Sequence, residues 1–249
     1  DNSVDSFTKH KTKLKKNRTE KLNRIDIQVD NKAKTVIISD NAHGMSLKEL
    51  KRALIPAKAN LDCDGIGKYG MGLKTAASWL GKVWTVRTKQ LGSTEEYIAK
   101  VDIPNLKASM KNFIPIRTKK LANTTRIKNS SYTIIEITSG IRKYGASTFT
   151  KTQRLLSIYY QKVISDDFHI YWRGKPIEYE EPMILKDKDP NGKMIKYDFK
   201  IKPFELNGQK ISGRYGLYFN RERGATGKQT PYSGVTAFWR KRVILTRES

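Results

Sequence analysis

The alternation of apolar and polar residues predicts strands and helices along the first part of the chain. Residues 25–29 alternate Ile, Asp, Ile, Gln, Val, which is typical of a half-buried strand, and 35–39 form a second, apolar strand after a short turn. Ser46 and Glu49 have the spacing of a capping box, and the apolar residues that follow recur at helical intervals. This part of the chain therefore predicts a mixture of strands and short helices.

The same pattern of apolar and polar residues predicts helices and strands over the rest of the chain. Helices are expected at 1–8, 73–80 and 148–164, a hairpin at 83–89 with 97–102, and a buried strand at 132–138; further hairpins and strands are expected at 168–172, 199–206, 215–219 and 235–245. Two basic segments lack periodicity. The first, 9–24, is expected to be an exposed loop or a frayed helix, and the second, 104–130, a loop or lid. After Gly140 the pattern changes to one amphipathic helix followed by a series of hairpins, so we expect two domains, 1–142 and 143–249.

Positive charge dominates the composition. The 49 Lys and Arg residues exceed the 24 Asp and Glu residues, for a net charge of +25, and much of the excess lies in three tracts, 9–24, 107–128 and 214–247. Such an excess predicts attraction to nucleic acid, with solvated lysine-rich faces as the plainer alternative. The candidate nucleic-acid contacts are Lys11, Lys13, Lys15, Lys16, Arg240, Lys241 and Arg242.

The sequence also predicts the cellular location and gives no sign of a zinc site. No apolar run is long enough for a membrane span, so no membrane partner is expected, and a single cysteine, Cys63, fits a reducing, intracellular compartment such as the cytoplasm, nucleoid or nucleus. His10, His43 and His169 lie far apart in the sequence and do not have zinc-ligand spacing. His43 and Cys63 are interpreted as non-catalytic residues, and the four tryptophans, Trp79, Trp84, Trp172 and Trp239, as core.

A glycine-rich segment at 65–72 is the first candidate for chemistry. Its string Gly65-x-Gly67-x-x-Gly70 matches a dinucleotide fingerprint, but no strand directly precedes it and the next strand ends in bases rather than an acid. Residues 227–229 also lack the spacing of a P-loop. Glycines ahead of a helix that begins near Leu73, with Lys74 in its first turn, nevertheless suit a phosphate group.

Three further elements accompany the glycines. Asp40 ends an apolar strand and begins the string Asp40-Asn-Ala-His-Gly-Met45, Asn2 and Asp5 lie on the first predicted helix, and Thr133 lies near the start of the predicted strand 132–138. In this order the four elements resemble the Bergerat-fold ATPases, the superfamily of DNA gyrase, the ninety-kilodalton heat-shock chaperones, histidine kinases and MutL. The implied fold class is α+β, a two-layer sandwich of a mixed sheet with helices on one face, followed by a transducer-like α+β domain.

Within that superfamily the chain resembles the MORC-type ATPases and their prokaryotic relatives. The first helix reads Asp-Asn-x-x-Asp, and the glycine-rich segment reads Gly-x-Tyr-Gly-x-Gly-Leu-Lys from Gly67 to Lys74. The likeness is good over about 1–102 and weaker over 143–249, where the hairpins and residues 238–244 resemble a transducer region.

The resemblance implies ATP and Mg²⁺ as cofactors and assigns roles to residues. Asn2 would coordinate Mg²⁺, Asp40 would bind the adenine amino group with Thr133 in the same network, and Gly44 and Met45 would line the base pocket. The segment that would wrap the triphosphate comprises Gly67, Lys68, Tyr69, Gly70, Met71, Gly72, Leu73 and Lys74, and Asp5 and Lys228 complete the expected nucleotide-binding set.

Two departures from the family pattern affect the expected activity. Ala42 stands where the family usually has glycine, and the family's general base, a Glu three residues before the Asp at position 1, lies outside this chain. No catalytic residue is therefore expected within the 249 residues. The expected function is an ATPase that dimerises on ATP and acts on DNA as a clamp or compaction enzyme. The alternatives are a protein-remodelling chaperone of the same fold and a DNA-binding module whose nucleotide pocket is inert; a histidine kinase is disfavoured, because no phosphoacceptor hairpin precedes the motif.

Overall fold

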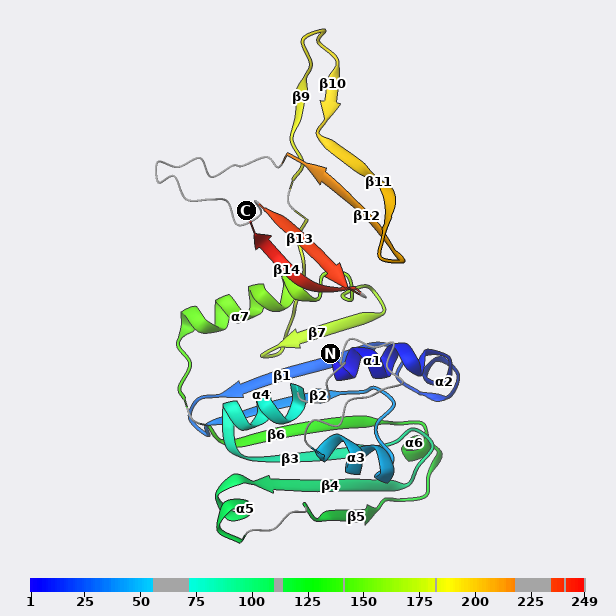
Figure 1. Ribbon diagram of the computed structural model, residues 1–249. Coiled ribbons are helices and arrows are strands. Elements are labelled where there is room, and N and C mark those ends of the chain that lie inside the picture. The colour runs from blue at the N-terminus through cyan, green and yellow to red at the C-terminus, as the bar shows by residue number, and fades with distance from the viewer. Residues whose placement is uncertain are drawn as a thin grey trace. The chain divides into compact units, whose positions relative to one another are not determined.

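The computed structural model describes residues 1–55, 72–109, 114–140, 142–181, 183–217, 234–239 and 241–248 (Figure 1). The chain forms two compact units. The first comprises Asp1–Glu178 with Trp239–Arg242, and the second comprises Tyr179–Phe238 with Val243–Ser249.

Helices and strands alternate along the first unit. Its helices are α1 (Asn2–Lys9), α2 (Lys11–Asn17), α3 (Leu47–Leu54), α4 (Gly72–Leu80), α5 (Ile103–Ser109), α6 (Thr125–Lys128) and α7 (Ala146–Tyr159). Its strands are β1 (Asn23–Asp30), β2 (Thr35–Asp40), β3 (Gly81–Lys89), β4 (Glu95–Asp102), β5 (Ile116–Lys120), β6 (Tyr132–Gly140), β7 (Phe168–Trp172) and β8 (Lys175–Pro176). None of the helices in the described parts of the chain is long and apolar enough to cross a membrane.

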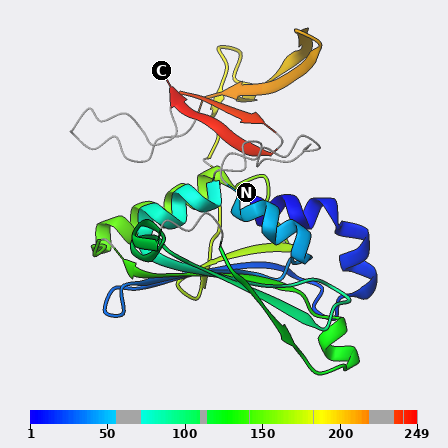
Figure 2. The same cartoon turned by 60° about the horizontal axis from the view of Figure 1, so that its bottom comes forward.

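The eight strands form one mixed sheet in the order β5-β4-β3-β6-β2-β1-β7-β8. The pairing of β1 with β7 is parallel and the other pairings are antiparallel. Helices α1, α3, α4 and α7 lie over the same face of the sheet (Figure 2). The predicted α+β class, with a mixed sheet covered by helices on one face, is confirmed.

The helix-covered face of the sheet carries two apolar clusters. One joins α1, β1 and β7 through residues that include Val4, Phe7, Ile25 and Phe168. The other joins α3 and α4 to β3, β4 and β6, with Leu50 and Val86 completely buried. The period of two in the strands and of about 3.6 in the helices directs these side chains into one layer, which explains why the sequence pattern located the elements.

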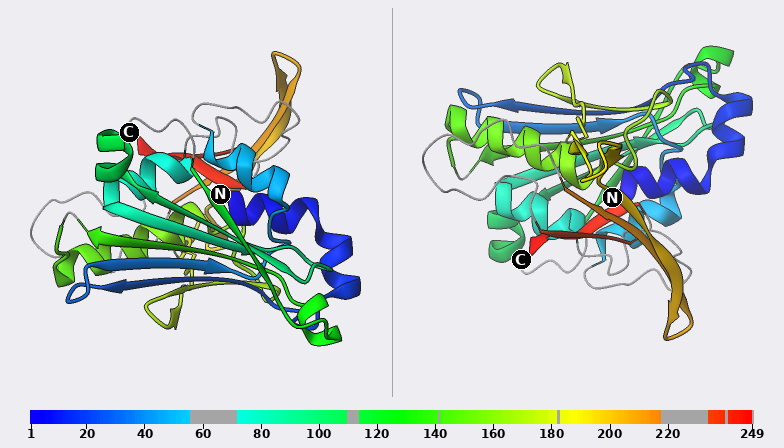
Figure 3. Two further views of the ribbon diagram at one scale, coloured as in Figure 1. Left: turned by 90° about the horizontal axis from the view of Figure 1, so that it is seen from below. Right: turned by 90° about the horizontal axis from the view of Figure 1, so that it is seen from above.

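The second unit is built from short antiparallel pairs. Its strands are β9 (Lys186–Lys188), β10 (Met194–Lys196), β11 (Asp198–Leu206), β12 (Gln209–Gly216), and all but one residue of β13 (Val235–Trp239) and of β14 (Arg242–Glu248). The remaining residues, Trp239 and Arg242, are counted with the first unit. The strands β11 and β12 form a narrow curved ribbon (Figure 3). Asn207 and Gly208 both have positive φ, 49° and 74°, so this hairpin turns where the Asn-Gly pair predicts.

The segment 104–130, predicted as a loop or lid, contains helices and a strand among its described residues. This segment includes most of α5, all of β5 and α6, and β5 pairs with β4 so that Lys119 faces Glu96 and Lys120 faces Glu95. β5 has little apolar alternation, and its backbone pairing with β4 adds it to the sheet as an edge strand. In α6 the Thr124 hydroxyl accepts the Ile127 amide at 3.3 Å as an N-cap.

Smaller differences concern the ends of elements and one side chain. Of the two alternatives for the segment 9–24, the helix is found from Lys11 to Asn17, as α2. Helix α7 ends at Tyr159 instead of 164, and 235–245 spans the hairpin β13–β14. Trp84 and Trp172 are core as predicted, whereas Trp79 is 67% exposed. The two compact units divide after Glu178. The predicted boundary between an ATP-binding domain, 1–142, and a transducer-like domain, 143–249, stays a prediction.

Candidate functional site

The first helix is anchored beside the end of β2. Val4 and Phe7 are buried, and the Phe7 ring packs edge-on against Phe168 with 5.0 Å between ring centres. This docking brings the Ser3 hydroxyl within 2.7 Å of Asp40 Oδ2, to which it donates a hydrogen bond. The amphipathic spacing of α1 therefore places its N-terminal turn against the last residue of β2.

Asp40 is a half-buried carboxylate held by two donors. Besides Ser3, the backbone N–H of Ala42 donates to Oδ1 at 3.0 Å, and the Asp40 backbone pairs with that of Thr133 in β6. Burial raises the pKa of the Asp40 carboxyl above its usual value, and the hydrogen bonds from Ser3 and Ala42 oppose the increase. The carboxylate is thus partly desolvated and fixed in orientation.

Thr88, fully buried in β3, connects the turn after β2 to β6. Its Oγ1 accepts the Met45 N–H at 2.9 Å and lies 3.1 Å from both the Tyr132 carbonyl oxygen and Thr133 Oγ1. A hydroxyl can donate one hydrogen bond and accept two, so Thr88 can donate to the Tyr132 carbonyl oxygen while it accepts from the Met45 N–H and the Thr133 hydroxyl. Thr88 thereby connects Met45 and Thr133, which are both predicted to bind the nucleotide. Thr88 itself belongs to none of the sequence motifs.

Gly44 occupies a position where no side chain fits. Its φ is +71°, and a Cβ built on it would lie 2.0 Å from the Lys89 carbonyl oxygen. A hydrogen bond from the Leu91 N–H to the His43 carbonyl oxygen, at 2.9 Å, holds the two backbone segments together at this point. The turn after β2 therefore packs its backbone directly on the end of β3.

Arg18 and Asn41 form a polar support on the other side of Asp40. Arg18 is 3% exposed, and its guanidinium donates to the carbonyl oxygens of Glu20, Asn41, Lys21 and Leu22 and to Asn23 Oδ1. Asn41 accepts the Arg24 N–H at 2.8 Å and donates to the Leu22 carbonyl oxygen at 2.8 Å. These contacts tie the segment after α2 to the residue that follows Asp40.

Other predicted nucleotide residues lie on α1 and α4. Asn2 is exposed at the start of α1, and Asp5 lies on the same helix. Lys74 lies in the first turn of α4, and its Nζ donates to the Ala53 carbonyl oxygen of α3 at 2.8 Å. The other members on α4 are Gly72 and Leu73, whereas Gly67, Lys68, Tyr69, Gly70, Met71 and Lys228 lie outside the described residues.

The predicted nucleic-acid residues differ in their surroundings. Those on α2, Lys11, Lys13, Lys15 and Lys16, are exposed while Leu14 anchors the helix. Lys241 is exposed in a turn, Arg242 forms an ion pair of 2.8 Å with Asp1, and Arg240 lies outside the described residues.

Sequence reasoning missed Ser3, Thr88, Asn41 and Arg18. Arg18 was counted in the basic tract 9–24 although its charge is directed inward onto carbonyl groups. Most groups that accept its hydrogen bonds are backbone carbonyl oxygens, which every residue carries. The sequence around Arg18 therefore gives no sign that its side chain is buried. Ser3 and Asn41 are adjacent to predicted residues, and that adjacency is the only sequence signal for them.

The described residues hold no group of three or more His, Cys, Asp or Glu side chains that could bind a metal ion. A metal in this region would need ligands from elsewhere, such as a nucleotide's phosphates. The amide oxygen of Asn2 is a suitable single protein ligand of that kind, because Mg²⁺ commonly takes one or two protein oxygens together with phosphates and water.

His43 makes the fold sensitive to acid. Its ring stacks on His10 with 3.9 Å between ring centres, and its buried Nδ1 has no hydrogen-bond partner. Burial, then the neighbouring His10 and Lys13, lowers the pKa of His43 to about 4. The folded state thus binds fewer protons than the unfolded state between about pH 4 and 6.5, so stability should rise with pH across that window.

We expect the free energy of unfolding to fall by about 2 kcal/mol between pH 7 and pH 4.5 because His43 must be protonated against its burial. His43→Phe keeps the ring stacking and should remove most of that decrease in urea titrations at the two pH values. The control His169→Phe, on β7, should retain it. An equal pH dependence in wild type and His43→Phe would contradict this assignment.

Comparison with known proteins identifies the family. Residues 1–133 match the family model described as histidine kinase-, DNA gyrase B- and HSP90-like ATPase. No curated protein sequence matches the chain. Similar solved structures include the following two. The ATPase region of Saccharomyces cerevisiae topoisomerase II has 14% identity and a TM-score of 0.48, with 75% of this chain and 54% of that chain covered. The same region bound to ICRF-187 (dexrazoxane) has 15% identity and a TM-score of 0.47, with 75% and 55% covered.

The present chain thus spans about half the length of those two structures. The family match is the stronger finding, because it covers more than half of the chain and includes α1, Asp40 and the turn after β2. It also reaches Thr133, which pairs with Asp40. The chain belongs to the histidine kinase-, DNA gyrase B- and HSP90-like ATPase family.

Proposed function

We propose that this chain binds ATP with Mg²⁺ at the Asp40 end of the sheet, dimerises when ATP is bound, and acts on DNA as a MORC-like clamp or compaction ATPase. The observation that carries the proposal is the Asp40 carboxylate. It is partly desolvated, accepts hydrogen bonds from Ser3 and Ala42, and pairs through its backbone with Thr133, whose hydroxyl contacts Thr88. A fixed carboxylate of this kind is a strong acceptor for the exocyclic amine of adenine.

The neighbouring residues fit the same role. Gly44 lets the backbone turn closely beneath the base, and Met45, held at its N–H by Thr88, offers an apolar contact. Asn2 would hold Mg²⁺, which neutralises phosphate charge when bound. Lys74 and Gly72 at the start of α4 would face phosphates, together with the segment from Gly67 to Met71 and with Lys228, because a helix N-terminus favours anions.

The family pattern implies a water-activating Glu at the position three residues before Asp1. The residues proposed here bind and orient the nucleotide, and general-base assistance, worth about 100- to 10,000-fold, would come from that Glu. ATP binding and hydrolysis would take place inside the cell, where ATP is available.

Exposed lysines on α2 are the proposed DNA contact. Reversing the charge of Lys11, Lys13, Lys15 and Lys16 to Glu should weaken binding and flatten the plot of log K against log salt, because each lost phosphate contact lowers the slope by about 0.9 for duplex DNA. Fluorescence anisotropy with a labelled duplex from 50 mM salt upward measures both quantities.

The matched control reverses Lys48 and Lys51 of α3, which should leave most of the salt slope intact. A slope unchanged in the α2 variant would exclude α2 as the contact. Absence of duplex binding at low salt would instead favour the chaperone alternative.

Dimerisation is tested separately. The full chain should change from monomer to dimer by light scattering when a nonhydrolysable ATP analogue and Mg²⁺ are added. A chain that binds the analogue and remains monomeric would contradict the clamp proposal while leaving nucleotide binding intact.

A further inference from the structure

An exposed tryptophan lies at the end of the sheet away from Asp40. Trp79, on the last turn of α4, is 67% exposed, whereas Trp84 and Trp172 are 2% and 8% exposed. Gly81, just after α4, pairs with Gly140, while Thr88 at the other end of β3 pairs with Thr133. Seven residues of strand separate those two pairs, which is roughly 23 Å. Trp79 is therefore distinct from the Asp40 site.

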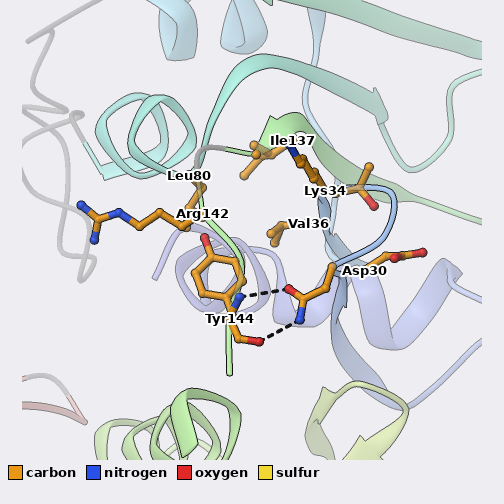
Figure 4. Close-up of a pocket in the computed structure, with 10 residues that line it drawn as sticks. Asp30, Lys34, Val36, Leu80, Ile137, Arg142 and Tyr144 are labelled. Carbon is orange, nitrogen blue, oxygen red and sulfur yellow. Dashed lines mark hydrogen bonds between the residues drawn. The ribbon is translucent and has the colours of Figure 1, made fainter. Parts of the chain in front are cut away.

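A cation already lies over the Trp79 ring. The Arg142 guanidinium carbon is 5.1 Å from the ring centre, within the range of a cation–π contact. Arg142 also lines a small hollow with Leu80, Lys34 and Tyr144 (Figure 4). The Asn31 side chain holds the backbone of Tyr144 at both its N–H and its carbonyl oxygen, at 3.1 and 2.7 Å. The segment that carries Arg142 is thereby fixed on the β1–β2 turn.

The charges around Trp79 favour an anionic partner. Arg142, which contacts the Trp79 ring, lines the hollow together with Lys34. Two further exposed basic residues lie close in the chain, Lys82 three residues after Trp79 and Lys143 next to Arg142. Two acids, Asp30 in the hollow and Asp102 opposite Val83, carry opposing charge, and the four basic residues outnumber them. Asp30 accepts the N–H groups of Lys32 and Ala33, and Asp102 accepts the amide of Asn105.

We propose that the Trp79 surface, formed by Trp79, Arg142, Lys34, Lys82 and Lys143, binds single-stranded nucleic acid. One unpaired nucleobase stacks on the Trp79 ring, and the basic side chains of the surface contact the phosphates on either side of it. Exposed aromatic side chains beside basic residues are the usual platform for single strands, because every base has a π-face and stacking needs no sequence match. A duplex keeps its bases stacked and lacks a free face for Trp79. The inference goes beyond the proposed function, because it requires neither ATP nor the α2 lysines.

The test uses the full chain and an oligothymidylate of about ten nucleotides, within the site sizes known for such surfaces. Trp79→Ala should weaken binding about 5- to 100-fold at constant salt, which is the range for loss of one base stack. The salt slope should stay unchanged, because no phosphate contact is lost. Arg142→Ala should lower that slope by about 0.7 if Arg142 contacts one phosphate of the single strand.

Tryptophan fluorescence gives a second, independent measurement. Oligothymidylate should quench the wild-type emission, and Trp79→Phe should lose that quenching while retaining most of the affinity, because Phe still stacks. Thermal unfolding checks that the variants fold, and titration with an ATP analogue should be unchanged in Trp79→Ala. A failure of nucleotide binding in wild type would contradict the proposed function without affecting this result.

Three outcomes would overturn the proposal. The first is unchanged oligothymidylate affinity in Trp79→Ala, and the second is quenching that persists in Trp79→Phe. The third is a change in self-association of the Trp79 variants without any change in nucleic-acid binding, which would make the surface a protein interface.

Discussion

Asp40→Asn should bind a nonhydrolysable ATP analogue about 100-fold or more weakly than wild type, while the protein stays folded. The asparagine amide can donate to Ser3 Oγ and its oxygen can accept the Ala42 N–H, so the local hydrogen bonds survive. What is lost is a charge-assisted acceptor for the adenine amine, worth about 1.5–3 kcal/mol, and the unpaired amine adds about 1–3 kcal/mol. Calorimetry with Mg²⁺ present measures the affinity.

Stability separates this loss of binding from unfolding. Burial raises the pKa of Asp40, so the ionised carboxylate costs the folded state free energy at neutral pH. Asp40→Asn removes that cost and should unfold at the same or a higher temperature than wild type. The control is Asp30→Asn, which makes the same charge change at the opposite end of the β1–β2 hairpin. Equal affinity in wild type and Asp40→Asn would overturn the adenine assignment.

Gly44→Ala should be the most destabilising single-methyl change in the turn after β2. The new Cβ would lie 2.0 Å from the Lys89 carbonyl oxygen, and the backbone at φ +71° disfavours any L side chain. Strain and overpacking of this kind each cost about 1–3 kcal/mol, so the free energy of unfolding should fall by about 2–5 kcal/mol. Urea denaturation followed by circular dichroism measures it.

A second glycine isolates the effect of the close approach. Gly92 also has a positive φ, +87°, but a Cβ there would meet nothing within 4 Å. Gly92→Ala should therefore cost only the conformational term, about 1 kcal/mol. If both variants lose the same stability, the contact between Gly44 and β3 contributes nothing and the rigid turn is not a feature of the site.

Local signals in the sequence determined most of the secondary structure. The capping box at Ser46 and Glu49 is present in full, and the Asn207-Gly208 and Arg173-Gly174 turns lie where the sequence places them. Each of these features depends on interactions within a few residues, so a short window contains the necessary information. The alternation at 25–29 predicted β1 for the same reason, because one buried face imposes a period of two.

The candidate site was predictable only where its residues belong to a motif. Asp40, Gly44 and Thr133 were named from the sequence, and the structure brings them together at one end of β2, β3 and β6. Thr88 has no local signal, because its role depends on a contact with Met45 that is 43 residues away in the chain.

Only the tertiary structure decided which charges are available and which strands are neighbours. Arg18 belongs to a basic tract by sequence, yet the fold surrounds it with carbonyl oxygens, whereas Trp79 resembles a core residue by composition and lies exposed beside Arg142. The parallel pairing of β1 with β7 and the edge strand β5 likewise depend on segments far apart in the chain. The physical reason is common to all of them. Burial and pairing are properties of the space around a residue, and residues distant in sequence create that space.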